Sequence, residues 1–523
     1  MRKILCVSVL FALLSCQGSG VPEGKTAEGE DGKVYHGMIQ LGEKLDDPYT
    51  VENMKKALES VYSTKSDRVD VVTTDLYVRF LPSGDEQLAK LQSLGLYLLD
   101  HPMDYRILRE GDYYKDPAVQ ENEITWQYAV VPKDFAFPSD IKYEVLDECF
   151  ISEHDPLAKS AEGIDWDLVE REAFRLTGNG DMLDEMTKAG GVAPSGRITI
   201  EDPLFSGGKP FGVAGVEVAC NIFVKIATCY TDRDGYYKME KNFSGKPRYR
   251  LVFQNEKGFK IGFNLILLPA SVSTLGKGEP EGMDWHVSAA DDNALFRRCA
   301  VNNAAYDYYT RCNELDLGVA TPPADLRFWI LNGLDCSSAS MLHHGAFLDN
   351  ALLVKYLGPW LALVKIFLPD VTIGTKEQDY AGIYTRVAHE LSHTSHYAQV
   401  GNSYWSPYVD YVIRSIISEG GDPYGTGEGD GASYCELGES WAYFMEESLK
   451  KDRYSGVIRR YGNTFWFRPD IFTDLYGYGM SREEMFRALT PDVTSMQQFK
   501  DALIKLYPDR ESIISQTFKR YGK

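Results

Sequence analysis

The chain has 523 residues, of which 44% are hydrophobic and 25% charged, and its formal net charge is −21 at pH 7. This length is more than one hydrophobic core usually serves, so we expect roughly two to four domains. The acidic balance argues against nucleic acid as a partner, because phosphate binding needs clustered lysine and arginine, and the sequence has no such cluster.

The first residues have the pattern of an export signal. Arg2 and Lys3 precede an apolar run over residues 4–14, which is too short to span a bilayer. The run ends in "LLSC", which resembles the lipobox of bacterial lipoproteins, with Cys16 as the residue that would be acylated. We therefore expect residues 1–16 to be a lipoprotein signal peptide. The protein would be exported and held at the bacterial outer membrane or cell surface by a lipid on Cys16. A cleaved signal with an incidental cysteine is the alternative.

The next part of the chain predicts a tether and then a mixed domain. Residues 17–32 are small, polar and aperiodic, which is typical of a flexible linker. Within residues 33–190, the helical spacing of 51–62 and the alternation of 75–82 predict an N-terminal α+β domain. The order of its segments resembles the N-terminal domain of exported lipoproteins of the Bacteroidetes type, a resemblance that implies no chemistry.

Residues 193–268 predict a second unit. Short strand patterns are separated there by turn signals about every ten residues. The segments "GVEVAC" and "TCYTDRDGYYKM" resemble the carboxypeptidase regulatory-like sandwich family, which implies a small β-sandwich that serves as a spacer or binding module. We expect Asp232 and Asp234 to form an Asx-type turn rather than a calcium site, because the further ligands of an EF-hand are absent.

Seven cysteines follow Cys16. In an export compartment they can pair, and the candidate disulfides are Cys220 with Cys229 and Cys299 with Cys312. Free buried thiols are the alternative.

The stretch "HELSHTSHY" carries the strongest chemical signal. It lies in residues 381–400, whose apolar positions repeat with a helical period. Residues four apart lie on one face of a helix, so His389 and His393 can reach one metal ion, with Glu390 beside them. These are the components of an HExxH zinc site, in which the glutamate takes a proton from water. We predict His389 and His393 as Zn²⁺ ligands and Glu390 as the catalytic base.

The third histidine of the stretch, His396, is predicted to be a bystander. It lies seven residues after His389 on the same face, but one helix cannot surround a tetrahedral metal. The metzincin pattern would need glycine at 396 and histidine at 399, and the chain has His396 and Gln399. We expect a packing, hydrogen-bonding or outer role for His396.

A catalytic zinc usually has three protein ligands, so a third is expected elsewhere. Residues 436–450 have the periodicity of a second helix, and their segment "ESWAYF" resembles the E-x-x-A-x-Y/F ligand helix of the gluzincin metallopeptidases. This resemblance implies that Glu439 is the third ligand. Glu436 stays open as an alternative, and Glu419, which precedes a glycine-rich stretch, ranks last.

The spacing departs from the gluzincin pattern, because forty-five residues separate His393 from Glu439. The excess, mainly "SYWSPYVDYVIRSII" and the glycine-rich residues 420–432, is expected to form a lid or substrate rim. Upstream, residues 326–332 and 363–374 predict strands of a small sheet before the histidine-rich helix.

These predictions combine into a multidomain α+β protein with an α/β N-terminal domain, a small β-sandwich and a mainly helical zincin-like domain over residues 285–523 that includes a small sheet. The gluzincin resemblance implies a zinc metallopeptidase that hydrolyses peptide bonds of proteins or glycoproteins, and the signal and lipobox patterns indicate that it is exported and lipid-anchored. The alternative is a surface lipoprotein that binds glycan or protein through a non-catalytic zincin-like domain.

Overall fold

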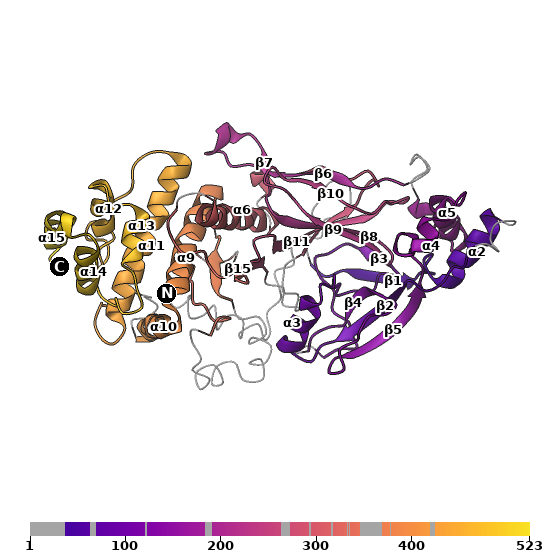
Figure 1. Ribbon diagram of the computed structural model, residues 1–523, viewed down its shortest axis with the longest axis horizontal. Helices are drawn as coiled ribbons and strands as arrows, with labels where there is room; N and C mark the ends of the chain where they lie inside the picture. The colour runs from indigo at the N-terminus through magenta and orange to yellow at the C-terminus, as the bar shows by residue number, and fades with distance from the viewer. Residues whose placement is uncertain are drawn as a thin grey trace.

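The chain is a mixed α+β protein whose C-terminal part is mainly helical, which confirms the predicted fold class (Figure 1). The computed structural model describes residues 37–62, 69–120, 123–183, 191–262, 272–291, 294–314, 317–331, 333, 335–345, 369–376, 378–418 and 424–523. The predicted signal peptide 1–16 with Cys16, the tether 17–32 and Glu419 lie outside these residues. Within the described residues, every helix is too short or too polar to cross a bilayer.

The N-terminal region combines two antiparallel sheets with flanking helices. Its elements are β1 (Gln40–Lys44), α2 (Val51–Val61), β2 (Asp75–Leu81), α3 (Asp85–Ser93), β3 (Tyr105–Arg109), β4 (Gln127–Pro132), β5 (Lys142–Cys149), α4 (Pro156–Lys159) and α5 (Trp166–Leu176). Strand β2 lies between β4 and β5, and β1 pairs with β3. The helix predicted at 51–62 and the strand predicted at 75–82 are confirmed. Helix α2 begins after Thr50, whose side chain accepts a hydrogen bond from the backbone of Asn53.

Two further sheets face each other in the middle of the molecule (Figure 1). The smaller contains β6 (Ser195–Ile200), β7 (Phe211–Gly212), β10 (Tyr236–Lys238) and β14 (Trp285–Val287). The larger contains β8 (Val216–Ile222), β9 (Lys225–Tyr230), β11 (Arg248–Asn255), β12 (Lys260–Ile261), β13 (Val272–Lys277), β15 (Arg327–Leu331) and β16 (Val371–Gly374). Apolar side chains from both sheets belong to one buried core. The helical C-terminal part is therefore joined to a substantial β-structure.

The turn between β9 and β10 has the chemistry predicted for it. The side chain of Asp232 accepts hydrogen bonds at 2.9 Å from the backbone N–H groups of Asp234 and Tyr236. Gly235 follows with φ 84°, and a Cβ there would lie 2.1 Å from the carbonyl oxygen of Ile198. This arrangement is an Asx-type turn that requires glycine at its tightest point.

The larger sheet continues across the boundary region predicted between residues 268 and 285. Strand β12 pairs in parallel with β15, which places Lys260 opposite Arg327 and Ile261 opposite Phe328. Strand β15 in turn pairs with β16, which ends six residues before the histidine-rich helix. The predicted boundaries stay predictions, but the sandwich and the helical part share one sheet and one core.

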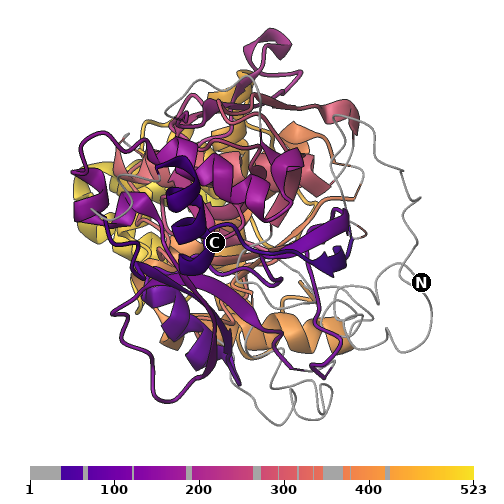
Figure 2. The same cartoon turned by 90° about the vertical axis from the view of Figure 1, so that its right-hand side faces the viewer.

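The C-terminal region is a layered set of helices. Its elements are α6 (Ala294–Asn313), α9 (Tyr380–Val400), α10 (Asn402–Ser418), α11 (Ala432–Tyr454), α12 (Asp470–Gly477), α13 (Arg482–Arg487), α14 (Met496–Leu506) and α15 (Glu511–Arg520). Helix α9 packs between α6 and α11. Seen along the long axis, the N-terminal elements lie in front and these helices behind them (Figure 2).

Arg453, near the end of α11, ties the two central helices to the sandwich. Its guanidinium carbon lies 3.9 Å from the ring centre of Phe205 and 4.8 Å from that of Tyr384 on α9. It also lies 3.5 Å from the buried carboxylate of Asp202, which accepts a hydrogen bond from Tyr454 at 2.7 Å. Because these contacts come from both helices and from the loop after β6, they fix the helices relative to the β-structure.

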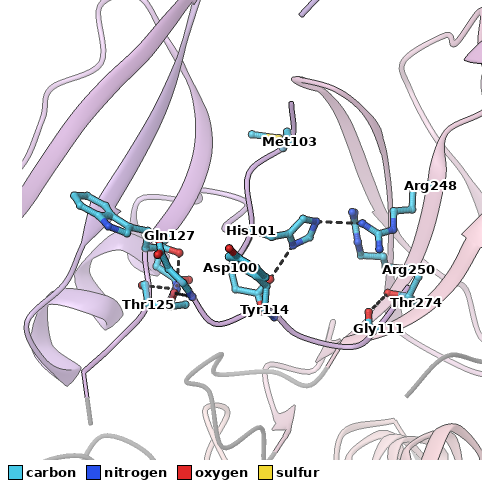
Figure 3. Close-up of polar contacts among 12 residues, drawn as sticks. Asp100, His101, Met103, Gly111, Tyr114, Thr125, Gln127, Arg248, Arg250 and Thr274 are labelled. Carbon is cyan, nitrogen blue, oxygen red and sulfur yellow. Dashed lines mark hydrogen bonds and ion pairs between the residues drawn. The ribbon is translucent and has the colours of Figure 1, made fainter. Parts of the chain in front are cut away.

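A buried polar network joins the N-terminal region to the larger sheet (Figure 3). His101 Nδ1 lies 2.8 Å from Asp100 Oδ1, and His101 Nε2 lies 3.2 Å from Nη1 of Arg248 on β11. Arg248 also pairs with Glu110. Burial lowers the pKa of His101 to about 4, against the opposing effect of Asp100. The imidazole is therefore neutral near pH 7, donating from Nδ1 to Asp100 and accepting at Nε2 from Arg248.

The candidate disulfides do not form. Cys220, Cys229, Cys299 and Cys312 are all free thiols. In the β8–β9 pair, Cys220 lies opposite Ala227 and Cys229 opposite Val218, so the two cysteines are not cross-strand neighbours.

Candidate metal centre

The predicted histidine-rich helix forms as α9. Asp379 caps its start by accepting a hydrogen bond at 2.8 Å from the backbone N–H of Gly382. The helix ends at Gly401, whose φ of 72° favours glycine and whose N–H bonds to the carbonyl of Tyr397. Nearly the whole helix is buried, because α6, α11 and β16 cover it. Its polar residues are thus inside the protein, where they need partners.

Helix α11 supplies those partners. It packs directly against α9 and carries Glu439 in its middle. His389, His393 and Glu439 each offer one ligand atom, and these atoms all lie within 4.8 Å of one another. They are the one group of this kind among the residues that the structure describes. All three are buried, with 8%, 2% and 3% of their surface exposed.

The ligand atoms of the three residues face one another. The two Nε2 atoms of His389 and His393 are 3.2 Å apart. Nε2 of His389 lies 3.5 Å from Oε2 of Glu439, and Nε2 of His393 lies 3.5 Å from Oε1 of the same carboxylate. Two nitrogens and a carboxylate thus converge on one point between α9 and α11.

This group fits a transition metal. Ligand atoms about 2.0–2.1 Å from a tetrahedral metal lie about 3.3–3.4 Å from each other, close to the separations of 3.2 and 3.5 Å found here. Oε2 of Glu439 and Nδ1 of His393 are buried without a hydrogen-bond partner in the described part of the chain. Two imidazoles argue against Mg²⁺ or Ca²⁺, which prefer oxygen ligands. The residues can therefore hold a metal ion, and their donor atoms favour one that accepts nitrogen.

Glu446 supports His389 from behind. Its Oε2 lies 2.8 Å from Nδ1 of His389, and its Oε1 accepts a hydrogen bond from the hydroxyl of Tyr461. A histidine that donates from Nδ1 has its lone pair on Nε2, the atom that faces Glu439 and His393. Burial works against protonation of His389, but Glu439 and Glu446 raise its pKa well above the ordinary value. Carboxylates behind histidine ligands set the tautomer in many metal sites.

Glu390, the predicted base, lies next to His389 and is 5% exposed. No described residue makes a hydrogen bond to its carboxyl group. Burial raises its pKa to about 8, with the charges of Glu439 and Glu446 adding to this effect and those of His389 and Arg386 opposing it. A cation held by the neighbouring triad would lower this pKa and favour the carboxylate form.

Aromatic rings form one wall of the centre. The ring of Tyr443, four residues after Glu439 on α11, lies 4.6 Å from the ring of His389. The hydroxyl of Tyr443 is 2.8 Å from that of Tyr424, and its ring packs against Phe465 at 4.7 Å. These contacts exclude water from one side of the triad and strengthen its electrostatic interactions.

The segment expected to be a lid or substrate rim is a packed helix where the structure describes it. Helix α10 covers residues 402–418, and Tyr404 and Trp405 are almost completely buried. Tyr408 of this helix donates a hydrogen bond at 2.6 Å to Oε1 of Glu439. The aromatic residues therefore pack one side of α10 into the core beside the site, and a lid or substrate-rim role of the segment stays a prediction.

The remaining candidates lie outside the triad. His396 is fully buried against Tyr404 and Trp405, and both its nitrogens lack hydrogen-bond partners among the described residues. Burial lowers its pKa to about 3, so it is neutral and packs in the core. Glu436 pairs with Lys523 near the end of the chain rather than joining the histidines. Of the two glutamates left open, the geometry therefore brings Glu439 to the site.

Sequence reasoning missed several residues of this centre. Glu446 has a usable signal, because it follows Glu439 by seven residues, two helical turns on the same face of α11. Tyr461 comes from a loop after the helix, and Tyr408 from the inserted segment, and nothing in the spacing of either points to the site.

A comparison with models of known protein families finds no match to this chain, and a comparison with curated proteins finds none either.

Proposed function

We propose that this chain is a zinc-dependent hydrolase, most simply a metallopeptidase, with His389, His393 and Glu439 as the zinc ligands and Glu390 as the catalytic base. The observation that carries the proposal is the convergence of two imidazole nitrogens and a buried carboxylate, with the buried Glu390 next to His389 along the helix. The resemblance of "HELSH" and "ESWAYF" to the gluzincin pattern agrees with this arrangement.

Zinc is the metal proposed, because it takes nitrogen and oxygen ligands in a tetrahedral arrangement and leaves one position open when three protein residues bind it. Two histidines and one carboxylate also hold iron in some oxygenases, with an octahedral geometry. The two nitrogen–oxygen separations of 3.5 Å are nearer to the tetrahedral value than to the roughly 3 Å between octahedral ligands, whereas the 3.2 Å between the two nitrogens lies between the two values.

In the proposed mechanism, zinc would supply Lewis acidity that polarises a substrate carbonyl and acidifies a water molecule. Glu390 accepts a proton from the attacking water and returns it to the leaving amine. Among the described residues none forms a hydrogen bond with its carboxyl group, so both oxygens are available for that transfer. Glu446 holds His389 in the tautomer that presents Nε2, and the ring of Tyr443 excludes water next to it.

We further propose that the protein is exported and anchored by a lipid on Cys16, as its "LLSC" segment indicates, and that its substrates are extracytoplasmic proteins, peptides or glycoproteins. Proteins exposed at a cell surface are the substrates such an enzyme would meet. The acidic chain and the absence of lysine and arginine clusters continue to argue against nucleic acid.

The test is hydrolysis by the zinc-loaded protein of unstructured proteins and of glycoproteins, followed by mass spectrometry of the products. Wild type should cleave, and Glu390→Gln should keep its zinc while losing about a hundred- to ten-thousand-fold in rate. Glu447→Gln, which changes a neighbouring buried glutamate of α11, should keep activity.

Bound zinc without cleavage of any such substrate would overturn the hydrolase proposal and favour a binding protein with a non-catalytic site. Loss of zinc from Glu390→Gln would show that Glu390 is a ligand rather than the base. Stoichiometric iron in place of zinc would overturn the metal assignment.

A further inference from the structure

The inserted helix α10 touches the metal centre through one side chain. Tyr408 is 7% exposed, and its hydroxyl donates a hydrogen bond at 2.6 Å to Oε1 of Glu439. Its ring lies 4.9 Å from that of Trp405 and 5.7 Å from that of His393. The phenol is thus held on both sides while its hydroxyl bonds to the carboxylate. A short hydrogen bond from a fixed donor limits how Glu439 can rotate.

The two oxygens of Glu439 have different surroundings. Oε1 accepts the hydrogen bond from Tyr408, whereas Oε2 is buried without a hydrogen-bond partner among the residues described. Each oxygen lies 3.5 Å from one histidine, Oε2 from Nε2 of His389 and Oε1 from Nε2 of His393, so the hydrogen bonding is what distinguishes them. A buried carboxylate oxygen without a donor is costly unless something else binds it. Oε2 is therefore the oxygen best placed to bind a metal.

The chemistry of the donor is as important as its position. In the described residues, the ion pairs of Glu439 run to His389 and His393, and none runs to lysine or arginine. A cationic partner at the place of Tyr408 would offset the negative charge that a metal needs. A phenol donates a hydrogen bond without a formal charge, so the carboxylate keeps its charge for the metal.

We propose that Tyr408 is a positioning residue that holds Glu439 as a one-oxygen ligand, with Oε1 bonded to the phenol and Oε2 directed to the metal. The inference rests on the proposed metal site and deepens it. It also gives the insertion between the two ligand helices a role: α10 supplies the group that orients the third ligand.

The experiment compares the full chain with Tyr408→Phe and with a matched control, Tyr404→Phe. Tyr404 lies on the same helix and is 1% exposed, and its hydroxyl donates to the backbone carbonyl of Tyr434 at 3.2 Å rather than to a ligand. Each variant loses one buried hydroxyl from α10. Zinc affinity is measured by competition with a chromophoric chelator, and the visible spectrum is recorded after loading with Co²⁺.

Tyr408→Phe should bind zinc about ten- to a hundredfold more weakly than wild type, as expected for the loss of a group that orients a ligand. Its Co²⁺ spectrum should also weaken, because the released Oε1 can approach the metal and raise the coordination number above four. Tyr404→Phe should match wild type in affinity to within about twofold and have the wild-type spectrum.

Wild-type affinity and spectrum in Tyr408→Phe would overturn this inference while leaving the metal site intact. Equal losses in Tyr408→Phe and Tyr404→Phe would overturn it too, because they would show a general loosening of α10. Absence of metal binding by the wild-type chain would instead overturn the proposed function, and this inference with it.

Discussion

Nδ1 of His389 and Oε2 of Glu446 lie 2.8 Å apart in the buried space between α9 and α11. This contact links the most informative sequence motif of the chain to a residue that the motif does not contain. It turns Nε2 of His389 toward His393 and Glu439, so the triad owes its orientation to a fourth side chain.

The first prediction follows from that contact. Glu446→Gln should weaken zinc binding about tenfold, because the imidazole of His389 loses a charged hydrogen-bond partner. Glu446→Ala should weaken it up to about a hundredfold, because the imidazole then has no partner that fixes its orientation. Chelator competition at pH 7 measures both. Glu447→Gln is the control, since Glu447 is the next residue of α11, is 6% exposed, and accepts hydrogen bonds from Tyr461 and the backbone of Arg459 rather than contacting His389. Unchanged affinity in Glu446→Ala would contradict the supporting role.

The buried network around His101 predicts a pH dependence of stability. The folded pKa of about 4 lies below the ordinary value near 6.5, so the unfolded chain takes up the proton first as the pH falls. Stability should therefore decrease between about pH 6.5 and pH 4, by up to about 3 kcal/mol from this residue.

The measurement is urea unfolding of metal-free wild type and His101→Gln across this range. Glutamine can donate to Asp100 and accept from Arg248 but does not titrate, so the variant should lose less stability on acidification. Parallel pH profiles for the two proteins would mean that His101 is not the titrating group.

The contacts of Arg453 predict that the stability of the metal-binding helices depends on their packing against the sandwich. Arg453→Ala leaves the carboxylate of Asp202 buried without its cation, a change that costs about 3–5 kcal/mol. Urea unfolding should show a loss of that size. Arg487→Ala is the control, because Arg487 is 62% exposed and pairs with Glu483 at the surface, where such pairs contribute about 0–1 kcal/mol. Similar effects of both substitutions would refute the coupling.

The shared sheet gives a further prediction about fragments. A fragment of residues 285–523 should fail to fold, because it lacks β12, the hydrogen-bonding partner of β15, and exposes Phe328, which is buried in the full chain. A fragment of residues 191–523 retains the sheet and should give a cooperative thermal transition. A cooperative transition from the shorter fragment would show that the helical part folds without the sandwich.

Much of the local structure could be predicted from the sequence, because apolar periodicity and capping residues act over short distances. Helix α9 and its metal face, helix α11 with Glu439, and the Asx turn at Asp232 all follow from such patterns. Tyr77 shows where alternation does not decide burial: it points to the opposite face of β2 from Val78, yet both side chains are completely buried. Its hydroxyl bonds to Asp104, so the second face of that strand is covered as well.

Contacts between distant segments were harder to predict. The pairing of β12 with β15 joins residues more than sixty positions apart, and no local pattern specifies it. The Tyr408–Glu439 contact depends on how the inserted helix α10 packs against α11. The chain has thirty-three tyrosines, and the sequence pattern does not indicate which of them reaches the site. Such contacts depend on how side chains from distant segments pack together in three dimensions, which the local sequence pattern does not specify.

The most direct test of the central claim is the metal content of the purified chain, measured by elemental mass spectrometry after dialysis. Wild type should retain about one zinc per chain, and His389→Ala and Glu439→Ala should retain almost none while keeping the helical circular dichroism of wild type. A wild-type chain without stoichiometric metal, or variants that hold zinc as well as wild type, would contradict the assignment of His389, His393 and Glu439 as its ligands.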